Sequence, residues 1–242
     1  PEGLRAGVLI LACLPTTITS CVVLTRTAGG DEALALVAAA SGSVVGVAVC
    51  PWTILALTGV RPEAPLLQVV TNLAVQTLLP LAVGQVLRLR WHVWFDHQRK
   101  ELGQWSNRAF LVILAYVVAT TISGGSVRLD AGILLRAGLA VGIGLPSLLL
   151  LAAGLARIPL LRLDRAGRIA VQICAAQKSA AIGIPVVGLL ATGRDDIGLI
   201  CLPIVLYHAC QLVVGGILAD RWGRGVGPGS ADPENRRSAA SS

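Results

Sequence analysis

Three adjacent polar residues, Gln177, Lys178 and Ser179, lie in the middle of the apolar stretch 169–190. The stretch is long enough to cross a bilayer, and Lys178 is one of only two lysines in the chain. Ionisable side chains at membrane depth are costly, so they usually face a bundle interior or a water-filled cavity. Gln177 and Ser179 add hydrogen-bonding groups where lipid offers none. These three residues are therefore the first candidates for a binding site.

A second interruption of an apolar stretch lies near the start of the chain, where Pro15 is followed by Thr16, Thr17, Thr19 and Ser20. Proline removes a backbone donor, and nearby hydroxyls can pair with the carbonyls that it frees or coordinate a cation. Proline and hydroxyl residues are common in ordinary transmembrane helices, so one such kink alone indicates packing. Two interruptions, one of them carrying a lysine, favour a binding site.

The elements that must position these residues are transmembrane helices. The chain of 242 residues is 55% hydrophobic and only 14% charged, which is too little polar surface for a soluble domain. The apolar runs predict an all-α polytopic membrane protein with seven spans, at residues 3–26, 33–57, 65–88, 107–126, 131–156, 166–192 and 196–220. The two interrupted spans are an odd number of spans apart, so they cross in opposite directions. Paired interrupted helices in inverted repeats point to a transporter binding site at the midplane.

The basic residues predict the orientation of the spans. One set of loops contains Arg26, Arg88, Arg90, Arg99, Lys100, Arg108, Arg157, Arg162, Arg165, Arg168, Arg221 and Arg224. The opposite loops contain only Arg61, Arg128 and Arg194, with Arg5 and Arg136 near span ends. The positive-inside rule makes the first set cytoplasmic, together with the C-terminus. Topology thus explains the net charge of +7, and we expect a lipid bilayer, that of the plasma membrane, but no nucleic acid as partner.

Other polar residues also lie at membrane depth. Gln68, Asn72 and Gln76 repeat every four residues and form one polar stripe, which either lines a substrate path or bonds to a neighbouring helix. His208 lies near Gln211 and is either an interhelical hydrogen-bond partner or a proton relay. The six cysteines lie in apolar runs without metal-binding spacing. We interpret them as buried thiols and predict no organic cofactor.

Three further segments have a structural interpretation. The loop 89–106 mixes tryptophans with basic residues, which is typical of a segment lying on lipid headgroups. The tail 223–242 is rich in Gly, Ser and Pro and is predicted to be disordered. Gly42 and Gly46 have GxxxG spacing, which favours close packing against that helix.

Four motifs, in the order LPTTITSCVVLTRTAGGDEALAL, QTLLPLAVGQVLR, CAAQKSAAIGIP and YHACQL, resemble the bile acid:sodium symporter family, in particular its solute carrier family 10 member 7-type branch. The resemblance covers nearly all of residues 3–222. It implies a ten-helix fold of two inverted five-helix repeats, in which two broken helices cross beside the sodium and substrate sites. The seven spans resemble the fourth to tenth helices of that fold, so we expect three spans to be missing before residue 1.

The same resemblance implies how the chain is divided. Residues 1–57 and 127–222 would be core-domain helices, with the second broken helix at 166–192. Residues 58–126 would be panel-domain helices that include the interfacial loop.

The resemblance matches the sodium ligands only in part. Ser20 and Gln177 match a ligand serine and a ligand glutamine, and Lys178 takes the place of an asparagine. The other ligand positions fall at Cys21, Ala35, Ala39 and Ile173, which offer no side-chain oxygen. Ser20 and Gln177 are therefore the candidate Na⁺ ligands, and either Na⁺ or H⁺ is the expected coupling ion. Our hypothesis is that the Lys178 ammonium replaces the cation and bonds to the nearby hydroxyls.

The sequence thus predicts a secondary active transporter of an organic anion that works by alternating access. The predicted binding residues are Pro15, Thr16, Thr17, Thr19, Ser20, Gln68, Asn72, Gln177, Lys178, Ser179 and His208. A non-transporting accessory or regulatory membrane protein would have the same features and stays open. An intramembrane enzyme using Ser179 or Ser20 with His208 has no motif for an activated nucleophile, so no catalytic residue is predicted.

Overall fold

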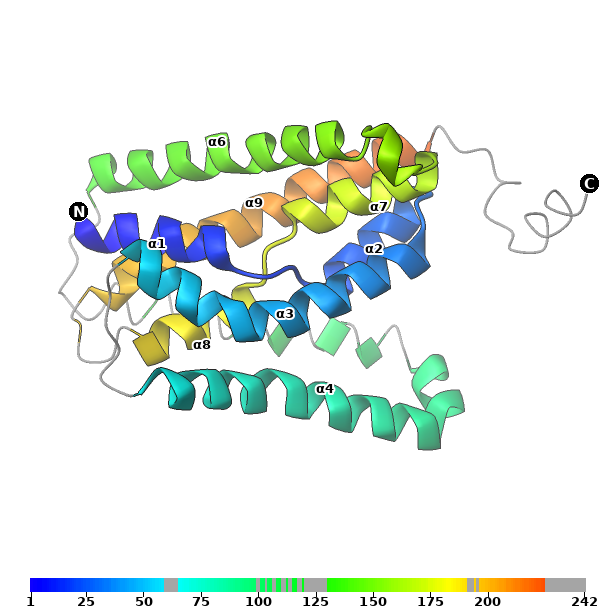
Figure 1. The fold of residues 1–242 in the computed structure, drawn as a ribbon, viewed down its shortest axis with the longest axis horizontal. Coiled ribbons are helices and arrows are strands. Elements are labelled where there is room, and N and C mark those ends of the chain that lie inside the picture. Colours follow the sequence, from blue (N-terminus) through cyan, green and yellow to red (C-terminus); the bar gives the residue numbers. More distant parts are fainter. Residues whose placement is uncertain are drawn as a thin grey trace, which may run out of the picture. The chain divides into compact units, whose positions relative to one another are not determined.

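The computed structural model describes residues 1–58, 65–98, 130–190, 194 and 196–224, with isolated residues between 101 and 119. Every regular element in these ranges is a helix (Figure 1), as the predicted all-α class requires. In chain order the helices are α1 (Glu2–Cys13), α2 (Ile18–Thr27), α3 (Glu32–Thr58), α4 (Leu66–His97), α6 (Ala131–Leu155), α7 (Arg165–Ala176), α8 (Ala180–Leu190) and α9 (Ile197–Gly223). A 3₁₀ turn at Pro159–Leu161 precedes α7.

Three of the helices, α3, α6 and α9, are long and apolar enough to cross a bilayer. On α6, Leu135, Leu139 and Leu150 are all more than half exposed, as expected of side chains that face lipid. Helix α4 continues past the predicted end of its span to His97, with non-helical backbone at Trp91. The predicted span 107–126 and the predicted disordered tail lie largely outside the described residues. The number of seven spans therefore stays a prediction.

Both interrupted spans are broken into two helices at the predicted places (Figure 1). The first unwound segment, residues 14–17, separates α1 from α2, and Leu14 has extended backbone with φ −65° and ψ 139°. The second unwound segment, residues 177–179, separates α7 from α8, and Gln177 is also extended with φ −89° and ψ 100°. Thr16, Thr17 and the run 177–179 thus lie in the unwound segments, whereas Thr19 and Ser20 lie in the first turn of α2.

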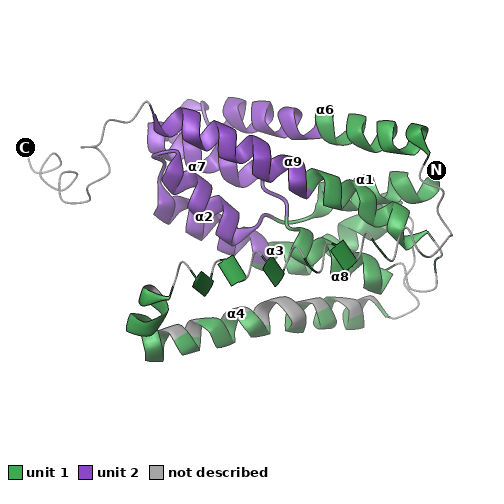
Figure 2. Cartoon of the chain, turned by 180° about the vertical axis from the view of Figure 1, so that it is seen from behind, with its two compact units in different colours: residues 1–15, 44–142, 179–207 green, residues 16–43, 143–178, 208–242 purple. Residues whose placement is uncertain are grey.

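The chain divides into two compact units (Figure 2). Unit 1 comprises Pro1–Pro15, Val44–Gly142 and Ser179–Tyr207, and unit 2 comprises Thr16–Ser43, Ile143–Lys178 and His208–Ser242. Their boundaries fall within α3, α6 and α9 and within both unwound segments. The predicted core and panel domains divide the chain differently and stay a prediction.

Unit 1 is held together by small residues and aliphatic side chains. Leu4 of α1, Ala137 of α6 and Leu199 of α9 form a buried cluster, and α8 packs against α1 and α4. A side chain added at Gly46 would overlap the ring of Pro15. The predicted close approach at this glycine is therefore confirmed, although its partner is the first unwound segment and not a regular helix.

Unit 2 has two buried clusters. One joins α2, α3 and α7 and consists of Cys21, Ala35, Ala39, Ala170 and Cys174. The other joins the turn after α2 to α7 and α9 and consists of Ala28, Ile169, Ile173 and Ala219. Small side chains make up the first cluster, so the backbones of α2, α3 and α7 approach closely there.

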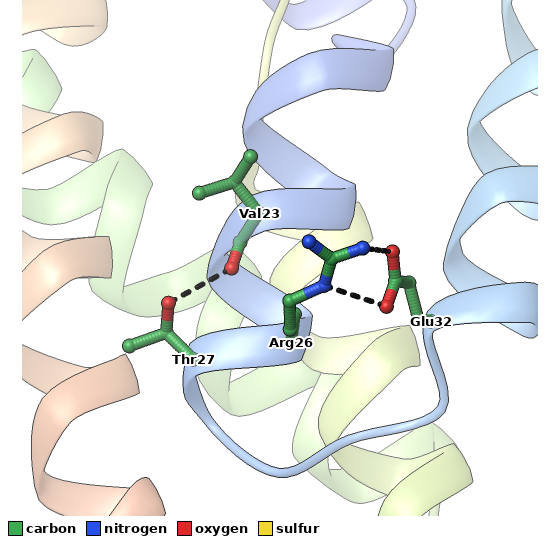
Figure 3. A network of polar contacts seen from close by, with 4 residues as sticks. All are labelled: Val23, Arg26, Thr27 and Glu32. Carbon is green, nitrogen blue, oxygen red and sulfur yellow. Dashed lines mark hydrogen bonds and ion pairs between the residues drawn. The ribbon is translucent and has the colours of Figure 1, made fainter. Parts of the chain in front are cut away.

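Four helix ends meet at one end of unit 2. They are the C-terminal ends of α2 and α9 and the N-terminal ends of α3 and α7. Figure 3 shows Arg26 reaching from α2 to Glu32 of α3, with its Nε donating to Oε2 at 2.7 Å. Arg165 of α7 donates to the carbonyl of Trp222 in α9 at 3.3 Å, and the Asp31 amide donates to the Ala166 carbonyl at 3.0 Å. Several arginines that were predicted to share the cytoplasmic face therefore lie together at this end.

Candidate functional site

The two unwound segments pair like short antiparallel strands. Within unit 2, Thr16 and Lys178 form an antiparallel bridge, and the Thr17 amide donates to the Gln177 carbonyl at 3.2 Å. The bonds of this bridge run between the residues that flank Thr16 and Lys178, so these two form a non-hydrogen-bonded pair. Opposite residues in such a pair share one face, with Cβ atoms roughly 4.5–5.5 Å apart. The Lys178 side chain therefore leaves the backbone beside that of Thr16.

The backbone of Lys178 is held on its other edge by Gln211 of α9. The Lys178 amide donates to Gln211 Oε1 at 2.6 Å, and Gln211 Nε2 donates to the Lys178 carbonyl at 2.8 Å. Gln211 is fully buried, so its amide acts in place of a neighbouring strand. An unpaired buried backbone group costs about 1–3 kcal/mol. Gln211 thus supplies the partners that the chain loses by unwinding at Lys178.

Ser43 of α3 has the corresponding role for the first unwound segment. Its Oγ lies 3.2 Å from the Thr16 carbonyl and 2.8 Å from the carbonyl of Ala39 in its own helix, so its single hydrogen is shared between these two acceptors. Each broken helix is therefore braced by a polar side chain from the helix that follows it in the chain. Sequence reasoning placed neither Ser43 nor Gln211 in the site. The sequence indicates Gln211 as a candidate, because it is a polar residue three positions after His208 in an apolar span. A single serine such as Ser43 gives no comparable indication.

The hydroxyl of Thr16 bonds to helix α7. Thr16 Oγ1 donates to the Cys174 carbonyl at 2.9 Å, and Cys21 Sγ lies 3.1 Å from the same oxygen. Because the hydroxyl hydrogen is used on Cys174, the Cys21 thiol is the donor to Thr16. The Cys174 thiol in turn points at the Ala35 carbonyl, 3.7 Å away. The Thr16 hydroxyl that we expected to bond to Lys178 therefore serves to hold α2 to α7.

The interpretation of the cysteines as buried thiols holds for only part of the set. Cys21, Cys50, Cys174 and Cys201 are buried, whereas Cys13 is half-buried and Cys210 is exposed. A position in an apolar run does not distinguish a side chain that faces the protein interior from one on the outer surface of a transmembrane helix. For Cys210 the prediction was wrong.

Gln177 and His208, both predicted to bind, are buried in unit 2. Gln177 is 2% exposed, and its Nε2 donates to the Gln211 carbonyl at 3.2 Å. Its Oε1 has no hydrogen-bond partner among the described residues, so this oxygen is a free acceptor. His208 is 9% exposed, with Nδ1 3.0 Å from Gln211 Nε2. Of the other predicted residues in this unit, Thr17 and Ser20 are half-buried and Thr19 is exposed.

Pro15, Ser179, Gln68 and Asn72 belong to unit 1. The Ser179 amide donates to the Pro15 carbonyl at 2.8 Å, and Ser179 Oγ accepts from the Ile182 amide at 3.3 Å. Ser179 thus caps the start of α8, which is a common structural role for a serine. Gln68 is exposed on α4 and Asn72 is half-buried there. Their part in a binding site stays a prediction.

Residues 1–224 match the SBF-like CPA transporter family. The chain belongs to this family. Sodium/bile acid cotransporter 7 of Rattus norvegicus is 29% identical over 218 residues, which cover 90% of this chain and 64% of the relative. Its counterpart in Danio rerio is 29% identical over 217 residues, which cover 90% of this chain and 65% of that relative. A Pseudomonas aeruginosa protein is 30% identical over 227 residues, which cover 93% of this chain and 67% of that protein.

The chain thus spans about two thirds of the length of the relatives that it matches. The family description and the printed names of the cotransporters are those of transporters and not of enzymes. The expectation that the chain is not an enzyme and belongs with the bile acid:sodium symporters is confirmed on that ground.

In this SBF-like chain, the positions that resemble the family's sodium ligands are packed against one another. Cys21, Ala35 and Ala39 are all fully buried members of one apolar cluster, and Ile173 is 3% exposed in the neighbouring cluster. Hard cations bind to oxygen ligands, and these four side chains supply none. What unit 2 offers at the unwound segments is the Gln177 Oε1 acceptor, the Lys178 ammonium and the imidazole of His208.

Proposed function

We propose that this chain carries the binding site of a secondary active transporter for an organic anion, which works by alternating access. Membership of a transporter family supports the proposal, as does the name of the sodium/bile acid cotransporter relatives. The observation that carries it is the bridge between Thr16 and Lys178. Non-helical backbone at membrane depth is tolerated where it lies inside the protein or lines a cavity, and transporters bind their substrates at such broken helices.

The preference for an anion rests on the charge of the site. Lys178 is half-buried on the second unwound segment, and its positive charge attracts a negative group of a solute that reaches this segment. Each unwound segment also precedes the N-terminus of a helix, α2 at Ile18 and α8 at Ala180. Helix N-termini carry a partial positive charge. The free Oε1 of Gln177 adds an acceptor for a hydroxyl or amide group of the solute.

The coupling ion in this proposal is H⁺ in preference to Na⁺. Ser20 is half-buried and Gln177 Oε1 is free, so these two remain the candidate oxygen ligands of a sodium ion. Two side-chain oxygens are few for a hard cation, which takes six or more oxygen ligands in calcium sites. A fixed ammonium at Lys178 supplies the positive charge that a bound Na⁺ would otherwise bring.

The binding site can be tested with purified protein and a panel of organic anions that includes a bile acid. We expect one or more anions to raise the unfolding temperature, and Lys178→Ala to weaken that binding about tenfold or more, the value of one charged hydrogen bond. Lys100→Ala is the matched control, because it removes the only other lysine of the chain. Equal binding by both variants would contradict the assigned site. A protein that no anion stabilises would favour an accessory role.

A further inference from the structure

The hydrogen bonds of Gln211 determine which nitrogen of His208 carries the proton. The Lys178 amide needs an acceptor and the Lys178 carbonyl needs a donor, so the two bonds to Gln211 assign its Oε1 and Nε2 without ambiguity. The Gln211 atom that lies 3.0 Å from His208 Nδ1 is therefore Nε2, which is a donor only. His208 Nδ1 must accept this bond. Neutral His208 consequently carries its hydrogen on Nε2.

A second proton on His208 is incompatible with this arrangement. The charged imidazole has a hydrogen on both nitrogens, so Nδ1–H would point at the NH₂ group of Gln211. The conflict is relieved when the Gln211 amide turns or moves away, and either change takes Oε1 from the Lys178 amide. The ring of His208 also hydrogen-bonds to the Lys178 backbone, so both Gln211 and His208 contact this residue. A hydrogen on Nδ1 and the hydrogen bond that Nδ1 accepts from Gln211 Nε2 therefore exclude each other.

Few other charges lie near the inner parts of the helices that pack around α9 in unit 2. The titratable groups described on the inner parts of these elements are Cys21 on α2, Cys174 on α7, Lys178 on the unwound segment, and Cys201, Tyr207 and Cys210 on α9 itself. The remaining charged groups that the structure describes on α2, α7 and α9 are Arg26, Arg165, Arg168, Asp220, Arg221 and Arg224, which lie at helix ends. Asp220 is about three turns from His208 along α9. Lys178 is thus the charged group on which protonation of His208 acts.

We propose that His208 is a proton-binding site, and that Gln211 transmits its charge state to the backbone of Lys178. The proton comes from water and forms an N–H bond at Nδ1, and no other covalent bond changes. Once Gln211 has moved, Lys178 keeps its bridge to Thr16 but loses the support of α9. Protonation therefore loosens the second unwound segment. If the proposed transport function holds, this residue makes H⁺ its coupling ion; the proton switch itself is independent of transport.

The tautomer can be measured directly, because the chain has three histidines. In His92→Gln/His97→Gln protein, His208 is the only histidine that remains, and ¹⁵N ring shifts in lipid bilayers report its state. We expect a bare Nδ1 and a protonated Nε2 at alkaline pH, with both nitrogens protonated on acidification. A neutral ring with its hydrogen on Nδ1, or a ring that never becomes charged while the protein stays folded, would overturn the proposal.

The link to Lys178 can be measured by hydrogen exchange of the peptide that contains it. After correction for the chemical pH dependence of exchange, acidification is expected to speed exchange of the Lys178 amide about tenfold, the value of one ordinary hydrogen bond. His208→Asn retains an acceptor but cannot be protonated, so its exchange should not change with pH. His92→Gln is the matched control and should behave as the wild type.

The same acid response in His208→Asn would overturn the proposal. If His208→Asn does not fold, the single-histidine measurement still decides between the two tautomers. Neither readout depends on solute uptake. If the proton switch is observed but no anion binds, the proton site holds and the proposed transport function fails. If an anion binds but the switch is absent, the transport function holds and the proton site fails.

Discussion

At the residue scale, the unwound backbone at Lys178 depends on a side chain from another helix. Gln211 makes both a donor and an acceptor bond to Lys178 and a third contact to His208. No other standard side chain offers an acceptor and two amide hydrogens in one rigid group, apart from asparagine, which is one methylene shorter. The glutamine is therefore specific to this position, and its loss cannot be compensated by a residue of similar size.

Gln211→Ala is expected to lower the free energy of unfolding by about 1–3 kcal/mol, because it removes both hydrogen bonds that Gln211 makes to the Lys178 backbone. Thermal unfolding of the purified protein in detergent measures this change. Gln68→Ala is the matched control, since Gln68 is exposed on α4 and its removal should change stability by less than about 0.5 kcal/mol. Equal unfolding temperatures for the two variants would contradict the role of Gln211.

The sequence reveals some of these residues and hides others for a physical reason. Lys178 and Gln177 are conspicuous because polar groups are rare in an apolar span. Ser43 and the contacts of Gln211 cannot be recognised from the sequence. Their partners are backbone groups that become free only once a distant segment unwinds. Cys21 looked like an inert thiol, yet its bond to the Thr16 hydroxyl helps to fix Thr16, and the Cys174 thiol contacts the Ala35 carbonyl.

At the element scale, the positions of the helix breaks follow polar residues more closely than prolines, because Pro15 lies in the first break and the second has none. The segment 177–179 unwinds without a proline. Prolines inside regular helices are Pro51, Pro80, Pro146, Pro185 and Pro203. A transmembrane helix can re-satisfy the carbonyls that a proline frees without unwinding. An unwound segment needs partners from other elements, and sequence alone does not identify them.

The contact between α3 and the first unwound segment predicts a sensitive glycine. Gly46→Ala places a methyl group against the ring of Pro15, and such overpacking typically costs about 1–3 kcal/mol. Gly138→Ala on α6 is the matched control, because no atom lies within 4 Å of the position that its Cβ would take. Unfolding temperatures should fall for the first variant and stay unchanged or rise slightly for the second. Two variants of equal stability would contradict the close packing at Gly46.

The start of α9 predicts a pH dependence of stability. Arg194 donates two hydrogen bonds of 2.8 Å to Asp196 and so holds the pKa of that carboxyl below its usual range. A carboxyl with a lowered pKa in the folded state stabilises fully above its unfolded pKa of about 3.9, and this contribution is lost as the pH falls through the lower folded pKa. Both side chains are about one third exposed, so the contribution is below about 1 kcal/mol.

The measurement is the unfolding temperature of wild type and Asp196→Asn across pH. We expect wild type to be the more stable at pH 7 and the difference to shrink toward zero in strong acid, once the pH falls below the lowered pKa of Asp196. A difference of the same size at both pH values would show that the carboxylate charge is not what stabilises this end of α9.

At the scale of the whole molecule, the orientation of the spans stays a prediction, and it concerns the arginines at the end of unit 2 where Arg26 contacts Glu32. Arg26, Arg165, Arg168, Arg221 and Arg224 all belong to helix ends in unit 2, as the positive-inside rule predicts for loops on one side of a membrane. A reporter fused after Ser242 should therefore be detected only from the cytoplasmic side of intact cells. Detection from outside would reverse the topology.

The all-α class and the family could be predicted from the sequence, because apolar runs indicate transmembrane helices and local motifs indicate the family. The number of spans and the inverted repeat are larger-scale features and stay predictions here. The structure adds a correspondence that the repeat would explain: Ser43 and Gln211 brace the two unwound segments from the helices that follow them.

The most direct test of the central claim is uptake of a labelled organic anion into proteoliposomes, with sodium and pH gradients varied separately. An anion that stabilises the purified protein is the appropriate probe. We predict uptake that a pH gradient drives without sodium, and that Lys178→Ala abolishes while Lys100→Ala does not. Strict sodium dependence that survives Lys178→Ala would contradict the account.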